Sequence, residues 1–441
     1  MEVYTYKKEL VLLADEPFSS GGEGEVRYVT SCPERFNNVC AKLYFKPKQT
    51  KEHECKIRYM VENPPQTIVG NGMMLAWPLE TIYTKNGVFI GFLMPTAFPD
   101  SKKLVILTLP KIKKAHKIEW YKFDKEYNIR FALVSRMKLI NNIAIPIHLL
   151  HATEKYVLKD FKPDNVLVTP SGKVTVVDMD SIQICENGKI LFPGTAATEE
   201  YVPPEFYKGV GRNNTVPLLK SWDNFAISVV FYKLLFGLNP YAITPKAETD
   251  DSSTVSYCIK ENLFPYGKNS DKIKTIPAPH NNFKIIPQPI QHLFVRSFGD
   301  NPADRPQAKE WIQTIKDVIK NVGPINDTPQ PPKPLPIEHN IRLMQTSNGK
   351  LKLSTYQAKE GTIITVNDYP DSGYKLDEIS YSYSGKTVSL KENQTFVMPD
   401  SDVTVSANFV KQNSGLGCQT AISIISLLIA LMFFASMLFD F

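Results

Sequence analysis

One short run of polar residues constrains this chain more than any other feature. The segment Leu158–Asn165 reads Leu-Lys-Asp-Phe-Lys-Pro-Asp-Asn, and an isolated carboxylate, Asp178, follows an apolar run thirteen residues later. A base (Asp160), a lysine two residues on (Lys162) and two metal-binding side chains (Asn165 and Asp178) are the groups that phosphoryl transfer needs. The spacing therefore predicts a phosphotransfer site.

Further motifs stand on both sides of this segment, so the prediction does not depend on one short pattern. They are the glycine-rich run Ser19–Val26, the strand-like run Val39–Lys42, the segment Thr198–Glu205 and the triplet Asp304–Pro306. On these motifs the chain resembles bacterial eukaryotic-like serine/threonine protein kinases with a compact N-lobe. The resemblance implies an α+β, bilobal fold, with ATP and Mg²⁺ as cofactors and Ser or Thr hydroxyls of proteins as acceptors.

The resemblance also implies which residues hold the nucleotide. Gly21 and Gly24 would let the backbone approach the phosphates, and Lys42 would reach the α- and β-phosphates. Side chains alternate along a strand, so Cys40 shares a face with Lys42 and would cover the adenine. The full set expected to bind nucleotide is Gly21, Gly22, Gly24, Val26, Cys40, Lys42, Met94 and Leu167, with Leu93–Thr96 as the interlobe hinge.

Lys42 needs a carboxylate partner, which the resemblance places on the helix that follows. That helix is expected at about Lys51–Glu62, because two prolines come next. Glu54 is the expected partner. Glu52 stays open as the alternative, because the spacing does not fix the register of the helix.

In the catalytic loop, the resemblance gives each polar residue a role. Asp160 would accept the proton of the acceptor hydroxyl, and Lys162 would stabilise charge on the moving phosphoryl group. Asn165 and Asp178 would hold magnesium. The expected catalytic set is thus Asp160, Lys162, Lys42 and Glu54. Thr198, together with Lys162, matches the serine/threonine-specific pattern.

Two departures from the family pattern carry information. The His-Arg-Asp triplet appears as Leu158-Lys159-Asp160, so a lysine without a bidentate fork replaces the arginine that would dock an activation-loop phosphate. Switching by loop phosphorylation is therefore not expected. The Asp-Phe-Gly triplet appears as Asp178-Met179-Asp180, so a residue that resists positive φ replaces the flexible glycine.

Two further contacts are expected to support the site. Glu205 would pair with Arg305 in a buried bridge that fixes the substrate platform, and its loss should be costly. Asp223 precedes an apolar helix and would bond to the backbone of the catalytic loop.

A proline-rich run divides the chain. Six prolines in Gly323–Pro336 favour an extended spacer. The expected organisation is a kinase domain at 1–323 (N-lobe about 1–95, C-lobe about 96–323), a linker at 324–337, an all-β module at 338–411, a second linker at 412–420 and a transmembrane tail anchor at 421–439. Turn residues Asn348-Gly349, Asp371-Ser372-Gly373 and Ser384-Gly385 mark the hairpins expected in the module. The module resembles the divergent internalin B-repeat family.

Composition bears on location and partners. Residues 421–439 carry no charge and are long enough to span a bilayer as a helix. The N-terminus shows no signal-peptide core and the six cysteines form no Cys-x-x-Cys pair, which favours a cytoplasmic kinase domain. A net charge of +6 is too small for its length to indicate nucleic-acid binding. The sequence predicts no partner for the β module.

Two interpretations of function follow. The first is a membrane-tethered, ATP-dependent serine/threonine kinase. The alternative is a pseudokinase, a nucleotide-binding scaffold without turnover. The first is favoured because Lys42, Asp160, Asn165 and Asp178 are all present.

Overall fold

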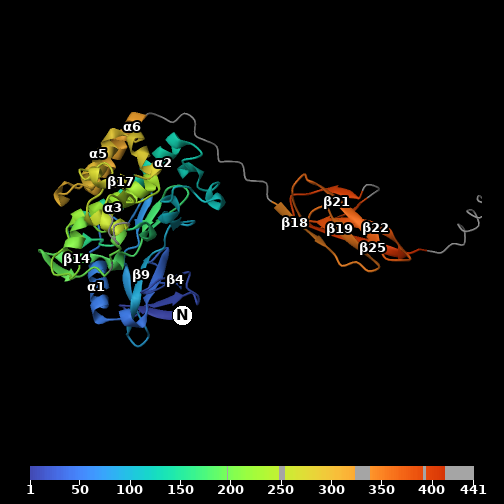
Figure 1. Cartoon of the computed structure of the whole chain (residues 1–441). Helices are drawn as coiled ribbons and strands as arrows, with labels where there is room; N and C mark the ends of the chain where they lie inside the picture. Colours follow the sequence, from blue (N-terminus) through green and yellow to red (C-terminus); the bar gives the residue numbers. More distant parts are fainter. Residues whose placement is uncertain (196, 248–253, 323–337, 391–393, 413–441) are drawn as a thin grey trace, which may run out of the picture. The chain divides into compact units, whose positions relative to one another are not determined.

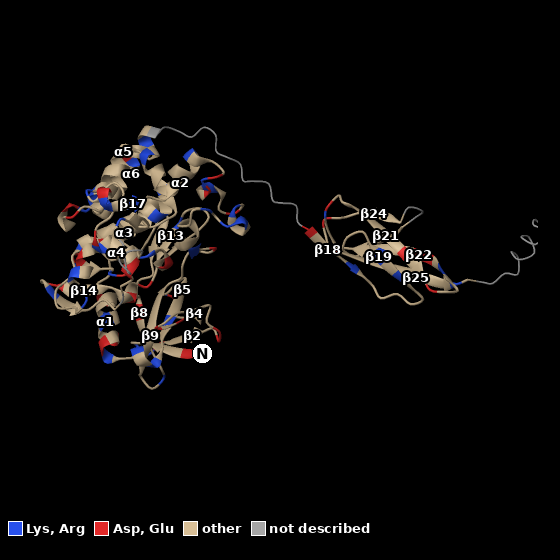
Figure 2. Cartoon of the chain, viewed as in Figure 1, with Lys and Arg blue, Asp and Glu red and all other residues tan. Residues whose placement is uncertain are grey.

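The computed structural model describes residues 1–195, 197–247, 254–322, 338–390 and 394–412. These residues form two compact units, one on each side of residues 323–337 (Figure 1). The first unit has mixed α and β structure and the second is all β, as expected. In Figure 2, residues of both charges are scattered over the helices and loops of the first unit.

The N-lobe of the first unit is built on a seven-stranded sheet with the order β2-β1-β8-β9-β5-β4-β3. Its strands are β1 Glu2–Thr5, β2 Leu10–Leu13, β3 Ser19–Ser20, β4 Gly24–Ser31, β5 Val39–Tyr44, β8 Glu80–Tyr83 and β9 Phe89–Pro95. Alternation along β5 divides its side chains between two cores. Ala41 and Leu43 pack with the N-terminal hairpin, whereas Cys40 and Tyr44 join the large core of the unit.

Helix α1 (Lys51–Glu62) lies where the sequence predicts it and packs against β8 and β9. The Thr50 hydroxyl caps its first turn by accepting the backbone N–H of His53 at 3.2 Å. The inner face of the helix buries Lys56, Ile57 and Met60. A cation on this buried face is unusual, because lysine is almost never fully buried without a partner.

The C-lobe is mainly helical. Its helices are α2 Ile129–His151, α3 Lys220–Phe236, α4 Val255–Lys260, α5 Gln288–Ser297 and α6 Ala308–Val322. Almost every residue of α3 is buried, so this helix runs through the centre of the lobe, in contact with α2 and α5. A helix that is apolar all round is stable only in such a position.

Short strands carry the loops of the site. They are β6 Val69–Gly70, β7 Met73–Leu75, β10 Lys102–Lys103, β11 Tyr156–Val157, β12 Val166–Val168, β13 Val174–Val176, β14 Gln183–Glu186, β15 Lys189–Phe192, β16 Thr244–Pro245 and β17 Ile273–Thr275. Strand β12 pairs antiparallel with β13, and β13 pairs parallel with β7. This pairing brings the loop before β12 next to the loop after β13, so the catalytic loop meets Asp178.

The second unit is a β structure with its own core. Its strands are β18 Glu338–Leu343, β19 Gly349–Leu353, β20 Gln357–Lys359, β21 Ile363–Pro370, β22 Tyr374–Tyr383, β23 Lys386–Leu390, β24 Thr395–Val397 and β25 Val403–Lys411. They form a five-stranded sheet, β20-β18-β25-β22-β23, and a three-stranded sheet, β19-β21-β24. Their buried residues include Ile364, Val366, Met398 and Val405.

Of the three expected hairpin turns, one connects paired strands in the manner of a tight hairpin. Ser384 and Gly385 both have positive φ, at 44° and 77°, and join the antiparallel pair β22 and β23. The turn at Asn348 joins β18 to β19, and the turn at 371–373 joins β21 to β22; each links the two sheets. Those two expectations were wrong, because turn residues do not specify which sheet the next strand enters.

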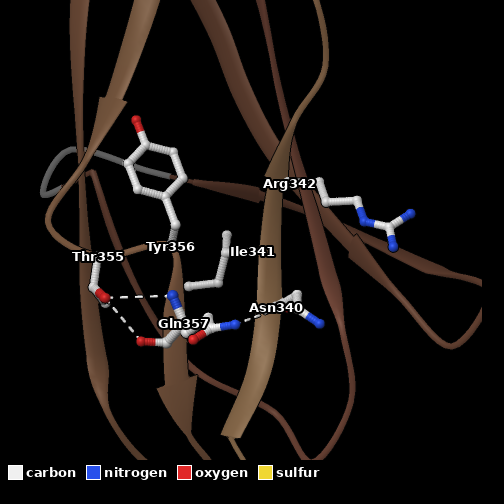
Figure 3. Close-up of a pocket in the computed structure, with 6 residues that line it drawn as sticks. All are labelled: Asn340, Ile341, Arg342, Thr355, Tyr356 and Gln357. Atoms are coloured by element: carbon white, nitrogen blue, oxygen red, sulfur yellow. Dashed lines mark hydrogen bonds between the residues drawn. The ribbon is translucent and has the colours of Figure 1, made fainter.

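A shallow hollow lies beside the edge strand β20 of this unit (Figure 3). It is lined by Asn340, Ile341, Arg342, Thr355, Tyr356 and Gln357. The Gln357 amide donates to the side-chain oxygen of Asn340 at 2.9 Å, which ties β20 to β18. These polar groups satisfy one another across the strand edge.

Within the described ranges, no helix is both long and apolar enough to cross a bilayer. The expected anchor at 421–439 lies outside the described residues.

Candidate active site

The nucleotide side of the candidate site begins on β5. Lys42 stands opposite Val26 of β4 and Phe92 of β9 in the sheet register. Cys40 stands opposite Met94, so the expected residues Val26, Cys40, Lys42 and Met94 lie on one face of the sheet. Burial raises the pKa of the Cys40 thiol to about 11, which keeps this face neutral and apolar beside the lysine.

The glycine-rich loop closes between β3 and β4. The N–H of Gly21 donates to the carbonyl of Gly24 at 2.9 Å. A Cβ at Gly21 or Gly22 would meet no atom within 4 Å, so this part of the loop is open to a ligand. A Cβ at Gly24 would lie 2.2 Å from the Leu43 carbonyl oxygen. The close packing of β4 against β5 therefore explains by itself why position 24 is a glycine.

The residues expected to form the hinge, Leu93–Thr96, lie at the end of β9 (Phe89–Pro95) and directly after it. Leu93 and Pro95 still belong to β9, and the Leu93 carbonyl accepts the N–H of Leu79 at 2.8 Å. The N–H of Thr96 donates to the Asn38 carbonyl at 2.7 Å. The first three of these residues therefore belong to the sheet, and the backbone of Thr96 is bonded to the segment before β5.

The ammonium of Lys42 joins the N-lobe to the loop after β13. It lies 3.0 Å from Asp178 Oδ1 and 2.7 and 2.8 Å from the two carboxylate oxygens of Asp180. Burial alone would lower the pKa of Lys42, but the two carboxylates outweigh it and raise this pKa above its ordinary value. Lys42 is therefore charged.

The expected pairing of Lys42 with Glu54 is absent, because Lys42 is bonded to Asp178 and Asp180. Glu54 accepts a hydrogen bond from the Tyr83 hydroxyl at 3.1 Å and forms an ion pair with Lys51 at 3.0 Å. The alternative, Glu52, is exposed. Helix α1 buries Lys56 and holds Glu54 against Tyr83 of β8, so Glu54 does not contact Lys42.

The catalytic loop gathers three of the expected polar residues. Asp160 is buried, and its Oδ2 accepts from the Lys162 ammonium at 2.8 Å. The same ammonium donates to the Thr198 hydroxyl at 2.9 Å, and the Asn165 amide donates to the Asp160 carbonyl at 2.9 Å. Asp160 Oδ1 is buried without a hydrogen-bond partner among the residues that the structure describes. A buried, unpaired carboxylate oxygen is costly unless a ligand completes it.

The backbone of the loop is fixed from α3. Asp223 accepts the N–H groups of Leu158 and Lys159 at 2.8 and 3.1 Å, and His151 Nε2 lies 2.8 Å from the same carboxylate. The sequence predicts the backbone contacts of Asp223. The contact with His151 is not predictable from the sequence, because it depends on how α2 packs against α3.

Lys159 is bound to neutral groups. Its ammonium donates to the Gly194 carbonyl at 2.9 Å and to the Asn214 side-chain oxygen at 3.0 Å. Burial lowers the pKa of Lys159. The segment after β15 is thus held by the lysine without any phosphate.

The two residues expected to bind metal sit at the ends of the β12–β13 pair. The carbonyl of Asn165 accepts the N–H of Val177 at 2.9 Å, which holds Asp178 beside the catalytic loop. Asp178 has a left-handed backbone, with φ of 62°, a conformation that only a small share of non-glycine residues adopt. Amide and carboxylate oxygens at this point are the ligands that Mg²⁺ prefers, and Asp178 is 37% exposed and so reachable.

Leu167 and the substrate platform complete the expected set. Leu167 is half-buried on β12. Arg305 binds Glu205 through two hydrogen bonds, at 2.6 and 2.8 Å, and its side chain is only 1% exposed. The structure therefore contains the bridge that the sequence predicts.

Comparison with known proteins agrees with this geometry. The protein kinase domain model matches residues 99–315, and the divergent InlB B-repeat domain model matches residues 339–413. The chain is 24% identical over 323 residues to protein kinase YegI of Escherichia coli K12, covering 71% of this chain and 46% of that protein. It spans about half the length of that relative.

Shorter stretches of the chain are also similar to animal protein kinases. Over 110 residues the chain is 31% identical to human serine/threonine-protein kinase MRCK gamma, covering 24% of this chain and 7% of that protein. Over 123 residues it is 28% identical to human MRCK alpha. The chain therefore carries a protein kinase domain, homologous to that of a bacterial protein kinase, followed by a divergent InlB B-repeat domain.

Proposed function

We propose that the chain transfers the γ-phosphate of ATP to Ser or Thr hydroxyls of proteins. The observation that carries the proposal is the carboxylate of Asp160. Lys162 binds one of its oxygens, and the other is buried and unpaired among the described residues, where it is suited to accept a hydroxyl proton.

The remaining groups fit the nucleotide and the metal. Lys42 is charged and suited to bind phosphate oxygens, and Gly21 and Gly22 leave the loop above it open. Asn165 and Asp178 would hold Mg²⁺, which would offset negative charge on the phosphates. Val26, Cys40, Met94 and Leu167 would contact the adenine, and Lys162 would stabilise charge on the transferred group.

Support for Ser/Thr specificity comes from Lys162 and Thr198. Their 2.9 Å contact places a cation and a hydroxyl beside the base, as the serine/threonine pattern requires. The MRCK kinases, which are similar over about a quarter of the chain, are named serine/threonine kinases.

We also propose that residues 421–439 tether the chain to a membrane, with the kinase domain on the cytoplasmic side. The support is the sequence alone, an uncharged run of bilayer-spanning length. A tether would raise the effective concentration of the kinase toward membrane neighbours. Membrane fractionation of the full chain and of a chain ending at residue 411 tests it; recovery of both in the soluble fraction contradicts it.

Phosphate transfer from γ-labelled ATP tests the enzymatic proposal. The full chain is incubated with Mg²⁺ and a generic acceptor such as myelin basic protein, followed by phosphoamino acid analysis. We expect labelled phosphoserine or phosphothreonine, and none with Asp160→Ala. Nucleotide binding without transfer to itself or to any acceptor tested would favour the scaffold alternative.

A further inference from the structure

Two carboxylates, Asp178 and Asp180, contact Lys42, and Asp180 is the more deeply buried of the two. It stands where the family pattern has the glycine of Asp-Phe-Gly, yet its side chain is 3% exposed, against 37% for Asp178. Both of its oxygens accept from the Lys42 ammonium, and the Tyr44 hydroxyl donates to Oδ2 at 2.7 Å. Burial works against ionisation of Asp180, but Lys42 and Tyr44 outweigh it and lower its pKa. Asp180 is therefore a charged, fully bonded group.

Helix α1 buries a cation, Lys56, whereas the partner of Lys42 expected on this helix is a carboxylate. Lys56 is 4% exposed on the inner face of the helix, and its ammonium lies 3.4 Å from the Pro193 carbonyl. Burial lowers the pKa of Lys56 to about 8, and Asp180 is the largest of the charges that oppose this shift. Asp180 thus binds Lys42 directly, and its charge favours the charged form of Lys56.

The two departures complement each other. The family pattern has a glutamate on the helix and a glycine in the loop, whereas this chain has a buried lysine on the helix and a carboxylate in the loop. A buried cation such as Lys56 is unfavourable without a nearby negative charge. Asp180 provides that charge and occupies the hydrogen-bonding directions of Lys42 that a helix glutamate would otherwise take.

We propose that Asp180 is the residue that positions Lys42 for nucleotide phosphates, in place of a glutamate on α1. The inference rests on the phosphotransfer function proposed above. Because Asp180 lies two residues after Asp178, the phosphate-binding lysine and the expected metal ligand are held by the same loop. The position of Lys42 is then set by this loop and does not depend on an ion pair with α1.

Matched isosteric variants of the full chain test the inference. Asp180→Asn and Glu54→Gln make the same chemical change, one in the loop and one on α1. Steady-state kinetics give kcat and the KM for ATP and for myelin basic protein, calorimetry gives the affinity for ATP with Mg²⁺, and melting temperatures show whether each variant is folded. Tyr44→Phe is the milder variant, because it removes one hydrogen bond to Asp180 and keeps every charge.

We expect Asp180→Asn to lower kcat by about 10- to 100-fold, the scale of a misplaced catalytic group, with an unchanged KM for the protein acceptor. Tyr44→Phe should lower kcat by about 2- to 10-fold, the value of one hydrogen bond, at a near wild-type melting temperature. Glu54→Gln should have a clearly smaller effect than either. If Asp180→Asn fails to fold, the comparison of Tyr44→Phe with Glu54→Gln decides.

Equal losses in the loop and helix variants, or a larger loss with Glu54→Gln, would overturn the inference while leaving phosphotransfer intact. A wild-type chain without transfer would end the enzymatic proposal instead. In that case calorimetry still decides, because ATP affinity must fall in Asp180→Asn and not in Glu54→Gln. Absence of nucleotide binding by the wild type would overturn both.

Discussion

The ammonium of Lys162 lies 2.9 Å from the hydroxyl of Thr198, thirty-six residues further along the chain. This contact ties the catalytic loop to the segment that leads to Glu205. Because the same ammonium also binds Asp160, Thr198 helps to place the proposed base and the proposed charge-stabilising group together.

Loss of the Thr198 hydroxyl should therefore reduce turnover. Thr198→Val keeps the shape of the side chain but removes the acceptor of Lys162, and we expect kcat to fall about tenfold, the scale of a hydrogen bond to a charged group. Thr198→Ser keeps the hydroxyl and serves as the matched control. Transfer rates from labelled ATP measure the effect, and equal activity of the Val and Ser variants would contradict it.

The bridge between Glu205 and Arg305 should be important for stability. Arg305→Ala leaves Glu205 without its bidentate partner, and we expect a loss of about 3–5 kcal/mol in the free energy of unfolding. Arg296→Ala is the control, because Arg296 and its partner Glu310 are 46% and 40% exposed and their pair should contribute about 0–1 kcal/mol. Urea denaturation of the two variants measures the difference. Similar losses would show that the bridge is not a determinant of stability.

The glycine-rich loop should tolerate alanine unevenly. Gly24→Ala would place a Cβ 2.2 Å from the Leu43 carbonyl and should cost about 1–3 kcal/mol through overpacking between β4 and β5. Gly22→Ala meets no neighbour within 4 Å and should leave the melting temperature unchanged. Thermal unfolding of the two variants checks this prediction, and a stable Gly24→Ala protein would contradict the packing argument.

Stability should also depend on pH through Lys125. Its half-buried ammonium donates to the Leu235 carbonyl, and burial lowers its pKa from 10.5 to about 6, with Arg136 adding to the shift. The unfolded chain therefore binds more protons between about pH 6 and 10.5, so the contribution of Lys125 to stability improves as pH rises through this window. The free energy of unfolding of the wild type, measured relative to that of Lys125→Met, should therefore be larger at pH 9 than at pH 6.5. Denaturant titrations at both values test this, and parallel pH profiles would contradict it.

The sequence predicts the order of elements and the gathering of distant polar residues well. Strand alternation places Cys40 and Lys42 on one face, and the spacing around Asp160 brings Asn165 to the loop and Asp178 beside it. These features follow from local patterns, because strand period and loop length are encoded within a few residues of each position.

The partner of Lys42 is not predictable in the same way. Successive residues of an α-helix are about 100° apart, so Glu54 lies on the opposite side of α1 from Glu52 and Lys56. The orientation of the helix about its axis decides which of these charged residues faces the core. Packing against β8 and β9 sets that orientation, and it is not encoded in the helix alone. The position of Asp180 depends likewise on the path of the loop after β13 in space.

A crystal structure of the full chain with Mg²⁺ and a non-hydrolysable ATP analogue tests the central claim most directly. We expect the triphosphate beside the ammonium of Lys42, a metal ion in contact with the side-chain oxygens of Asn165 and Asp178, and Asp180 still bound to Lys42. A nucleotide bound elsewhere, or a metal ion that contacts neither Asn165 nor Asp178, would contradict it.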